Sequence, residues 1–154
     1  MKVTHTLEQQ PSFHSEKPVQ KVLQNFQSRE IKDTIDIQGF TFNEAFSHNY
    51  LFEGKTGRDF CFKYIEYIDV DYDKGYFLTM AAQEGDDEML RALIEKGADV
   101  NIDNESALTA AINHRQEGCV KLLVDEGANP KKLWGTALAA YNKIAGEGSV
   151  HPIV

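Results

Sequence analysis

The chain has 154 residues, which is enough for one domain with an extension and excludes a separate hidden catalytic domain. Its 42% hydrophobic and 26% charged residues are close to globular averages and exclude a largely disordered chain. The net charge of -8 is concentrated in residues 65–105, where twelve acidic residues face three basic ones. This segment therefore disfavours nucleic acid and favours a basic protein partner.

Residues 1–36 are predicted to form an extension before the main domain. Residues 1–16 have the composition of a flexible segment and contain no apolar core of a secretory signal. The apolar spacing in "KPVQKVLQNFQS", residues 17–28, predicts a short amphipathic helix, and the alternating isoleucines in "EIKDTIDIQGF", residues 30–40, indicate a short strand. Without a signal or a long apolar run, we expect a cytoplasmic protein.

Residues 37–70 are predicted to form a divergent first repeat that covers the end of the repeats after it. Thr41 and Glu44 have the spacing of a capping box at the start of a helix. The following "GRDFCFKYIEYID", residues 57–69, has apolar residues at helical spacing but also alternates as a strand would. We favour the helix, because a helix pair here would cover the open end of the stack.

An internal repeat occupies the second half of the chain. "LTMAAQEGDDEMLRALIEKGADVN" from Leu78 aligns without gaps on "LTAAINHRQEGCVKLLVDEGANPK" from Leu108, at a constant offset of 30 residues, and a partial third copy continues at Leu138. Each full copy predicts a short alanine-rich helix, a turn, a second helix with an apolar stripe, and a glycine stop at Gly97 or Gly127. In the first copy Asp86 is placed to cap the second helix.

These segments resemble ankyrin repeats. The residues that carry the resemblance are "AAQEGDDEMLRALIEKGADVN", residues 81–101, and "EGCVKLLVDEGANP", residues 117–130. The resemblance implies an all-α solenoid of helix-turn-helix repeats with hairpin loops. The period of 30 is shorter than the family's period of about 33, so we expect a shortened loop around residues 102–105. The repeat boundaries that follow from this alignment are 71–103, 104–133 and 134–154, within an ankyrin-repeat domain of 37–154.

A metal site or an active site is not indicated. The acidic stretch from Asp69 to Asp73 begins like a calcium loop, but counting from Asp69 puts Lys74 where glycine is needed and Met80 where the bidentate glutamate is needed. The two cysteines and five histidines lack the spacing of metal ligands, and no nucleophile or phosphate-loop motif occurs. We therefore expect no metal, no cofactor and no catalysis.

The resemblance implies protein binding through hairpin tips and the concave face of each first helix. Carried over by position, it predicts these partner-binding residues: Asp71, Tyr72, Asp73, Lys74, Gln83, Glu84, Asp87, Asn104, Glu105, Asn113, His114, Trp134 and Lys143. Trp134 is the strongest single candidate, because exposed tryptophans are often hot spots of interfaces. The competing interpretation is that Trp134 packs over the last helix as a lid.

The third copy has a first helix but no second one. Either the tail "SVHPIV", residues 149–154, folds back, or the uncapped end is covered by a partner or by a second copy of the chain. Together these patterns predict a non-catalytic protein-protein interaction module, a small acidic adaptor or inhibitor such as an immunity protein that neutralises a cognate toxin. The alternative is a secreted effector or viral-type ankyrin protein that binds a host protein.

Overall fold

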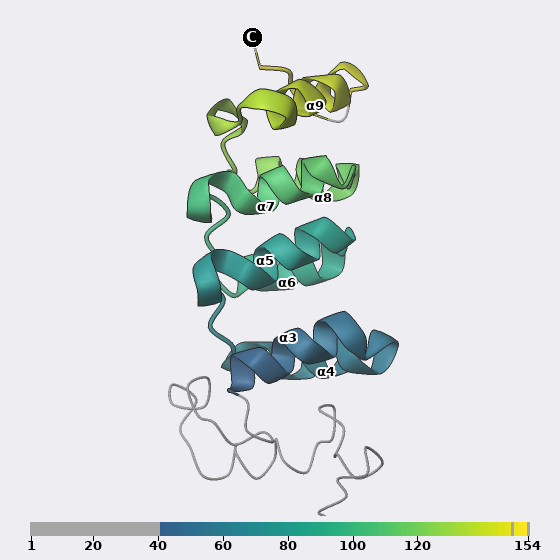
Figure 1. Cartoon of the computed structure of the whole chain (residues 1–154), viewed down its shortest axis with the longest axis vertical. Helices are drawn as coiled ribbons and strands as arrows, with labels where there is room; N and C mark the ends of the chain where they lie inside the picture. The colour runs from purple at the N-terminus through teal and green to yellow at the C-terminus, as the bar shows by residue number, and fades with distance from the viewer. Residues whose placement is uncertain (1–40, 149, 154) are drawn as a thin grey trace, which may run out of the picture. The chain divides into compact units, whose positions relative to one another are not determined.

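The computed structural model describes residues 41–148 and 150–153, and within these residues the protein contains seven α-helices, two short 3-10 helices and no strand (Figure 1). The all-α prediction is confirmed for this part of the chain. The chain divides into two compact units, Met1–Asp69 and Val70–Val154. The predicted helix at 17–28 and strand at 30–40 lie outside the described residues.

The first unit contains a helix pair. Helix α3 (Phe42–Phe52) packs against α4 (Gly54–Tyr64), and the 3-10 helix η2 (Ile65–Tyr67) follows directly (Figure 1). The favoured helical interpretation of residues 57–69 is therefore confirmed, and the alternating pattern does not form a strand. Phe60 and Tyr64, four residues apart on one face of α4, both contact the buried ring of Phe42, as helical spacing requires.

The predicted capping box fixes the start of α3. The backbone N–H of Thr41 donates to Oε2 of Glu44 at 2.8 Å, and the N–H of Glu44 donates to Oγ1 of Thr41 at 3.3 Å. Each bond satisfies an N–H group that has no partner within the helix. The bond from the Thr41 N–H, followed by one from the Thr41 hydroxyl to the same Oε2 at 2.9 Å, lowers the pKa of the Glu44 carboxyl, because both bonds stabilise its charged form.

The second unit contains three successive layers of helices. They are formed by α5 (Tyr72–Glu84) with α6 (Asp87–Glu95), by α7 (Ile102–Asn113) with α8 (Glu117–Asp125), and by the 3-10 helix η3 (Pro130–Lys132) with α9 (Gly135–Gly146). Helix α7 lies between α5 and α9 and contacts both, while α6 contacts α8 (Figure 1). The repeat found in the sequence is thus a repeat in space.

Small residues on the first helix of each layer let the layers approach closely. Ala81 on α5 and Ala107 and Ala111 on α7 have no exposed surface. The second helices supply the larger apolar side chains, and these are buried as their spacing predicts. They are Met89, Leu90 and Leu93 on α6, and Cys119, Val120, Leu122 and Leu123 on α8.

The predicted helix ends of these second helices are confirmed. Oδ1 of Asp86 accepts a hydrogen bond from the N–H of Met89 at 3.0 Å and caps α6. After α6 and α8 the chain turns at Gly97 (φ 104°) and Gly127 (φ 102°), a left-handed conformation that glycine adopts at the lowest cost.

The connection between layers is a tight left-handed turn. Asp73, Lys74 and Gly75 open α5 with φ values of 44°, 58° and 77°, and Asp103 and Asn104 repeat this geometry before α7 with φ values of 48° and 55°. Three consecutive residues of this hand are costly outside glycine, because the Cβ atom crowds the backbone. The shortened loop expected from the 30-residue period is this turn.

The described part of the tail after α9, residues 150–153, folds back onto that helix. This is the first of the two alternatives predicted for the uncapped end. The hydroxyl of Tyr141 donates to the carbonyl of His151 at 2.9 Å, and the N–H of Ile153 donates to Oδ1 of Asn142 at 3.1 Å. Both anchor residues belong to α9, so the tail contacts the helix of the layer that has no second helix. Among the residues that the structure describes, no helix is long and apolar enough to cross a membrane.

Candidate functional site

The structure brings four of the predicted partner-binding residues together around one groove. A hollow of about 290 Å³ lies between the end of α7, the start of α8 and α9, and a second hollow of about 170 Å³ adjoins it near η3. Asn113 and Thr136 line both hollows, so we treat them as one feature, the α7–α9 groove. The predicted residues Asn104, Asn113, Trp134 and Lys143 all line it.

Other residues of the groove were missed by the sequence analysis. Arg115, Glu117 and Glu147 line the larger hollow, and Lys132 lines the smaller one. The sequence did contain a signal for Arg115, because the 30-residue register aligns it with Gly85, a residue with a left-handed backbone. The alignment alone shows that a long cationic side chain stands in the second copy at a position where the first copy has glycine.

Trp134 is the most exposed large hydrophobic residue of the described chain, at 84%. It is the N-cap of α9 and has an extended backbone, with φ -142° and ψ 165°. The interpretation of this side chain as a lid buried over the last helix is therefore wrong. The indole instead forms part of the wall of the smaller hollow, open to solvent.

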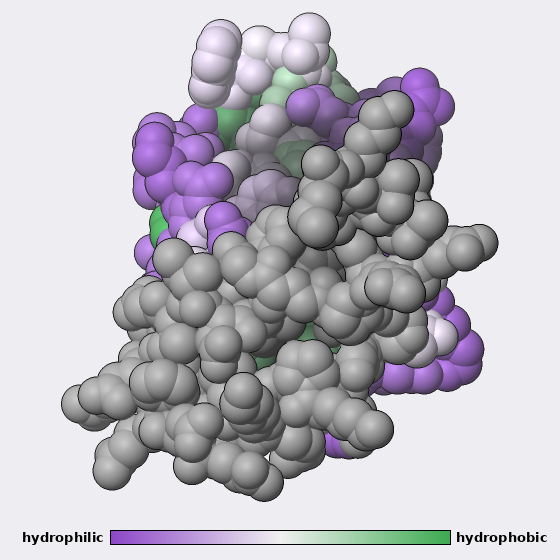
Figure 2. Space-filling view, turned by 60° about the horizontal axis from the view of Figure 1, so that its bottom comes forward, coloured by the Kyte–Doolittle hydropathy of each residue, from purple (hydrophilic) through white to green (hydrophobic). Residues whose placement is uncertain are grey.

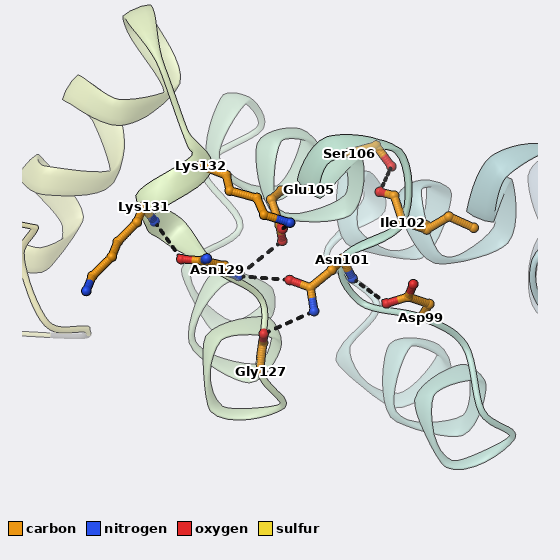
Figure 3. A network of polar contacts seen from close by, with 9 residues as sticks. All are labelled: Asp99, Asn101, Ile102, Glu105, Ser106, Gly127, Asn129, Lys131 and Lys132. Carbon is orange, nitrogen blue, oxygen red and sulfur yellow. Dashed lines mark hydrogen bonds and ion pairs between the residues drawn. The ribbon is translucent and has the colours of Figure 1, made fainter.

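A ladder of side-chain hydrogen bonds runs along the turns from Asp71 to Lys131, and Figure 3 shows the part from Asp99 onward. Oδ1 of Asp71 accepts from the N–H of Asp99 at 3.5 Å, whose own Oδ1 accepts from the N–H of Asn101 at 2.9 Å. Oδ1 of Asn101 accepts from the N–H of Asn129 at 3.2 Å, whose Oδ1 accepts from the N–H of Lys131 at 3.1 Å. The ladder links the layers, so the Asp71 carboxylate has a structural partner.

Glu105 requires a correction, because its side chain is fully buried and cannot contact a partner directly. Its Oε2 accepts from the N–H of Asn129 at 3.1 Å, and Nζ of Lys132 lies 3.3 Å from its Oε1, an oxygen that accepts no hydrogen bond (Figure 3). Glu105 has φ 64° at the position where the α5 turn has Gly75. Its role is to tie the turn before α9 to α7.

Asp87 also combines exposure with a contact inside the protein. Its Oδ1 accepts a hydrogen bond from the Cys119 thiol at 2.9 Å across the α6–α8 interface. Burial, followed by this hydrogen bond and the nearby carboxylate charge, raises the pKa of the Cys119 thiol to about 12. The thiol is therefore neutral at physiological pH and is not a nucleophile.

The remaining predicted residues lie at the surface of the α5 and α7 layers. Asp73, Lys74, Gln83, Glu84 and His114 are exposed, and Tyr72 is half-buried. In the face shown by Figure 2, the visible atoms of the described residues are mostly hydrophilic, and only small hydrophobic areas show. The structure shows where these residues lie, and their contact with a partner stays a prediction.

A known family matches the region that contains these layers. The family described as ankyrin repeats, in three copies, matches residues 52–133. The chain belongs to the ankyrin-repeat family. The match begins in α3, so ankyrin character extends into the first unit, where the sequence predicts a divergent repeat at 37–70.

The ankyrin assignment is supported by one curated relative. A putative ankyrin repeat protein of Acanthamoeba polyphaga mimivirus is 38% identical over 75 residues. The alignment covers 45% of this chain and 46% of that relative, so the chain spans about half the length of the relative it matches. No solved structure matches the chain.

Membership of the ankyrin family identifies the chain as a protein-protein interaction module. Ankyrin proteins are generally non-enzymatic, and the described residues contain no group of three or more side chains that could hold a metal ion. The chemistry of the α7–α9 groove is that of recognition, since its lining offers hydrogen-bond donors, acceptors and an exposed indole.

Proposed function

We propose that this ankyrin protein is a non-catalytic adaptor or inhibitor that binds one partner protein across the exposed ends of α5, α7 and α9. The observation that carries the proposal is Trp134, whose indole is 84% exposed beside the α7–α9 groove. A large aromatic side chain gains free energy when a partner covers it, and such residues dominate binding energy at interfaces.

The acidic surface at α5 and the start of α7 supports a partner with a basic patch. Asp73 and Glu84 of α5 and Asp103 at the start of α7 are exposed, and all three lie in the segment that carries most of the negative charge. Such a field accelerates the approach of a basic surface and weakens as salt is added. Asp71 and Asp87 add charge, although both carboxylates also hold the fold together.

The proposed role is that of a small cytoplasmic inhibitor, for which an immunity protein that neutralises a cognate toxin is the sharpest form. Small size, acidity and a surface built for recognition support this role. A second candidate is a viral-type ankyrin protein that binds a host protein, which the similarity to the mimivirus ankyrin repeat protein supports.

The test is to capture partners from the source cells with the full chain and two double variants. Asp73→Lys with Glu84→Lys reverses charge on the proposed face, whereas Glu95→Lys with Glu126→Lys reverses the same charge at the ends of α6 and α8. We expect the wild type and the second variant to retain the same protein, and the first variant to lose it. Equal retention by all three would refute the acidic docking surface.

The identity of the captured protein then separates the two candidate roles. A toxic protein whose activity the chain blocks supports the immunity role, and a protein of a host cell supports the viral-type role. A Trp134→Ala variant tests the central observation. It should weaken binding at least tenfold, and unchanged affinity would show that the partner does not cover the indole.

A further inference from the structure

The charge of the exposed face changes sign from α5 to α9. Glu84 is exposed at the end of α5, the equivalent residue at the end of α7 is His114, and the exposed cation Lys143 lies near the end of α9. In the turns, Asp73 lies in the first turn of α5 beside the exposed Lys74, while Lys131 and Lys132 precede α9. All these residues belong to the second unit, so acidic residues at α5 and basic residues at α9, the latter beside Glu147, lie on one compact unit.

Two cations of the α7–α9 groove lack partners. Within the described chain, the Arg115 guanidinium and the Lys143 ammonium take part in no hydrogen bond or ion pair, although Glu117 and Glu147 line the same hollow. Their donors are therefore available to a ligand. A guanidinium offers paired N–H groups whose geometry fits a carboxylate, and the neighbouring Asn113 and Thr136 add neutral hydrogen-bonding groups.

The backbone of Arg115 is strained, and the fold gains nothing visible from its side chain. Arg115 has φ 57° at the position where the α5 layer has Gly85 with φ 73°. Glu105 is also a non-glycine residue at a glycine position, but its carboxylate is held by Asn129 and Lys132. Arg115 is exposed and has no such compensation, and strain of this kind is typical of functional positions.

Trp134 and Lys143 mark the two ends of a site of definite length. They are separated by nine positions, almost all of them in α9, which corresponds to roughly 13 Å along the helix axis. An extended peptide advances by about 3.3 Å per residue, so about four peptide residues span this distance. A ligand that contacts both ends must carry its two anchors at that spacing.

We infer that the α7–α9 groove binds an extended acidic segment of the partner protein. A carboxylate of the segment binds Arg115 and Lys143, and a large apolar side chain about four residues away packs on Trp134. The partner is thereby held in one orientation, with its acidic segment at α9 and its basic surface at α5. The inference rests on the proposed function and specifies the chemistry of its ligand.

The probe for this inference is a displayed library of random peptides of about twelve residues, selected against the full chain. We expect the enriched peptides to carry Asp or Glu three to five positions from a large apolar residue. One enriched peptide is then synthesised, and its affinity is measured from the fluorescence of Trp134, the only tryptophan in the chain. The affinity should fall severalfold between about 50 and 500 mM salt, since charges carry part of the binding.

Two matched variants decide whether the carboxylate binds as inferred. Arg115→Gln with Lys143→Gln should lower the affinity of the peptide at least tenfold. Lys121→Gln removes a cation from α8 that is paired with Asp125 and does not line the groove, so it should change the affinity less than twofold. Circular dichroism confirms that each variant is folded before affinities are compared.

The inference is overturned if the library yields no binder, if the binders lack acidic residues, or if the double variant binds as the wild type does. These results do not judge the proposed function. Capture of a partner that depends on Trp134 or on the acidic residues at α5 would still support that function while the acidic-segment ligand is rejected. If the chain captures no partner and also binds no acidic peptide, the proposed function and the acidic-segment ligand are both rejected.

Discussion

The α5–α6 layer and the α7–α8 layer share one register but differ at two backbone positions that favour glycine. The first layer has Gly75 and Gly85 there, and the second has Glu105 and Arg115, all with positive φ. The backbone strain at Glu105 is compensated inside the fold, because its carboxylate binds Asn129 and Lys132. The strain at Arg115 has no such compensation. The difference separates a residue kept for stability from one available for binding.

The comparison is tested first at Gly75, where a side chain has no room. A Cβ atom there would overlap Cγ2 of Ile102, and the backbone is left-handed with φ 77°. We expect Gly75→Ala to lower the free energy of unfolding by about 3 kcal/mol, from strain and overlap together. Urea unfolding followed by circular dichroism measures this change.

The matched control is Gly97→Ala, which has φ 104° but nothing within 4 Å of the added atom. It should cost only the backbone strain, about 1 kcal/mol. If both substitutions cost the same, the close contact with Ile102 contributes nothing to the requirement for glycine in the α5 turn.

The second prediction concerns the compensation of Glu105. Lys132→Met leaves a fully buried carboxylate without its cation, and we expect a loss of about 2 kcal/mol of unfolding free energy, because Lys132 is itself half exposed. In a Glu105→Gln background, the same Lys132 substitution should cost no more than about 0.5 kcal/mol. This double-mutant cycle, measured by urea unfolding, isolates the pair.

Lys131→Met is the control for the Glu105 cycle, since Lys131 is exposed and its bond to Asn129 uses the backbone N–H. It should change the stability by no more than about 0.5 kcal/mol. Equal costs for Lys132→Met in both backgrounds would mean that Glu105 does not depend on Lys132 and that its strain is offset by the bond to Asn129 alone.

The register of the repeat and its glycine stops could be predicted from the sequence because they are local properties. Leucines, alanines and Gly97 or Gly127 recur at a fixed spacing, and each has a physical reason that needs only its neighbours along the chain. Trp134 was also recognised, since it is the only tryptophan and stands in a polar loop.

The buried position of Glu105 and the groove could not be predicted in the same way. Glutamate at a turn suggests exposure, and only the approach of Asn129 and Lys132 from the next layer makes burial favourable. Arg115 differs from Glu105, since its alignment with Gly85 is a signal in the sequence, but that alignment does not show that the side chain lines a groove. Glu105 depends on contacts between layers, and such contacts have no signature in the spacing of one layer.

The third prediction concerns Cys119, which occupies in α8 the register position that Met89, a residue without an ionisable group, occupies in α6. The pKa of the buried Cys119 thiol is raised to about 12, above the value of about 8.5 expected in the unfolded chain. Below pH 8 both states keep the proton and stability does not depend on this thiol. Above about pH 8.5 only the unfolded state loses it, so stability falls by at most about 1.4 kcal/mol per pH unit.

Urea unfolding between pH 7 and 10 measures this slope, and Cys119→Ala should show a shallower decline than the wild type over the upper part of that range. Cys61 stays in both proteins as an internal reference, since its buried thiol also has a raised pKa. Parallel declines in the two proteins would mean that the Cys119 thiol ionises as readily in the folded chain as in the unfolded one.

The smallest expected effect is also the one that reports on function. Arg115→Gly removes the strain of a side chain at φ 57°, and although glycine adds freedom to the unfolded chain, we expect a net gain of about 0.5 kcal/mol in unfolding free energy. The reverse change, Gly85→Arg, should destabilise the α5 layer, where the new Cβ also meets the Gln116 side chain.

A residue whose removal stabilises the fold is retained for another reason, and in this groove that reason is the proposed ligand. If Arg115→Gly instead destabilises the protein, Arg115 stabilises the α7–α8 turn, and the contrast with Glu105 disappears.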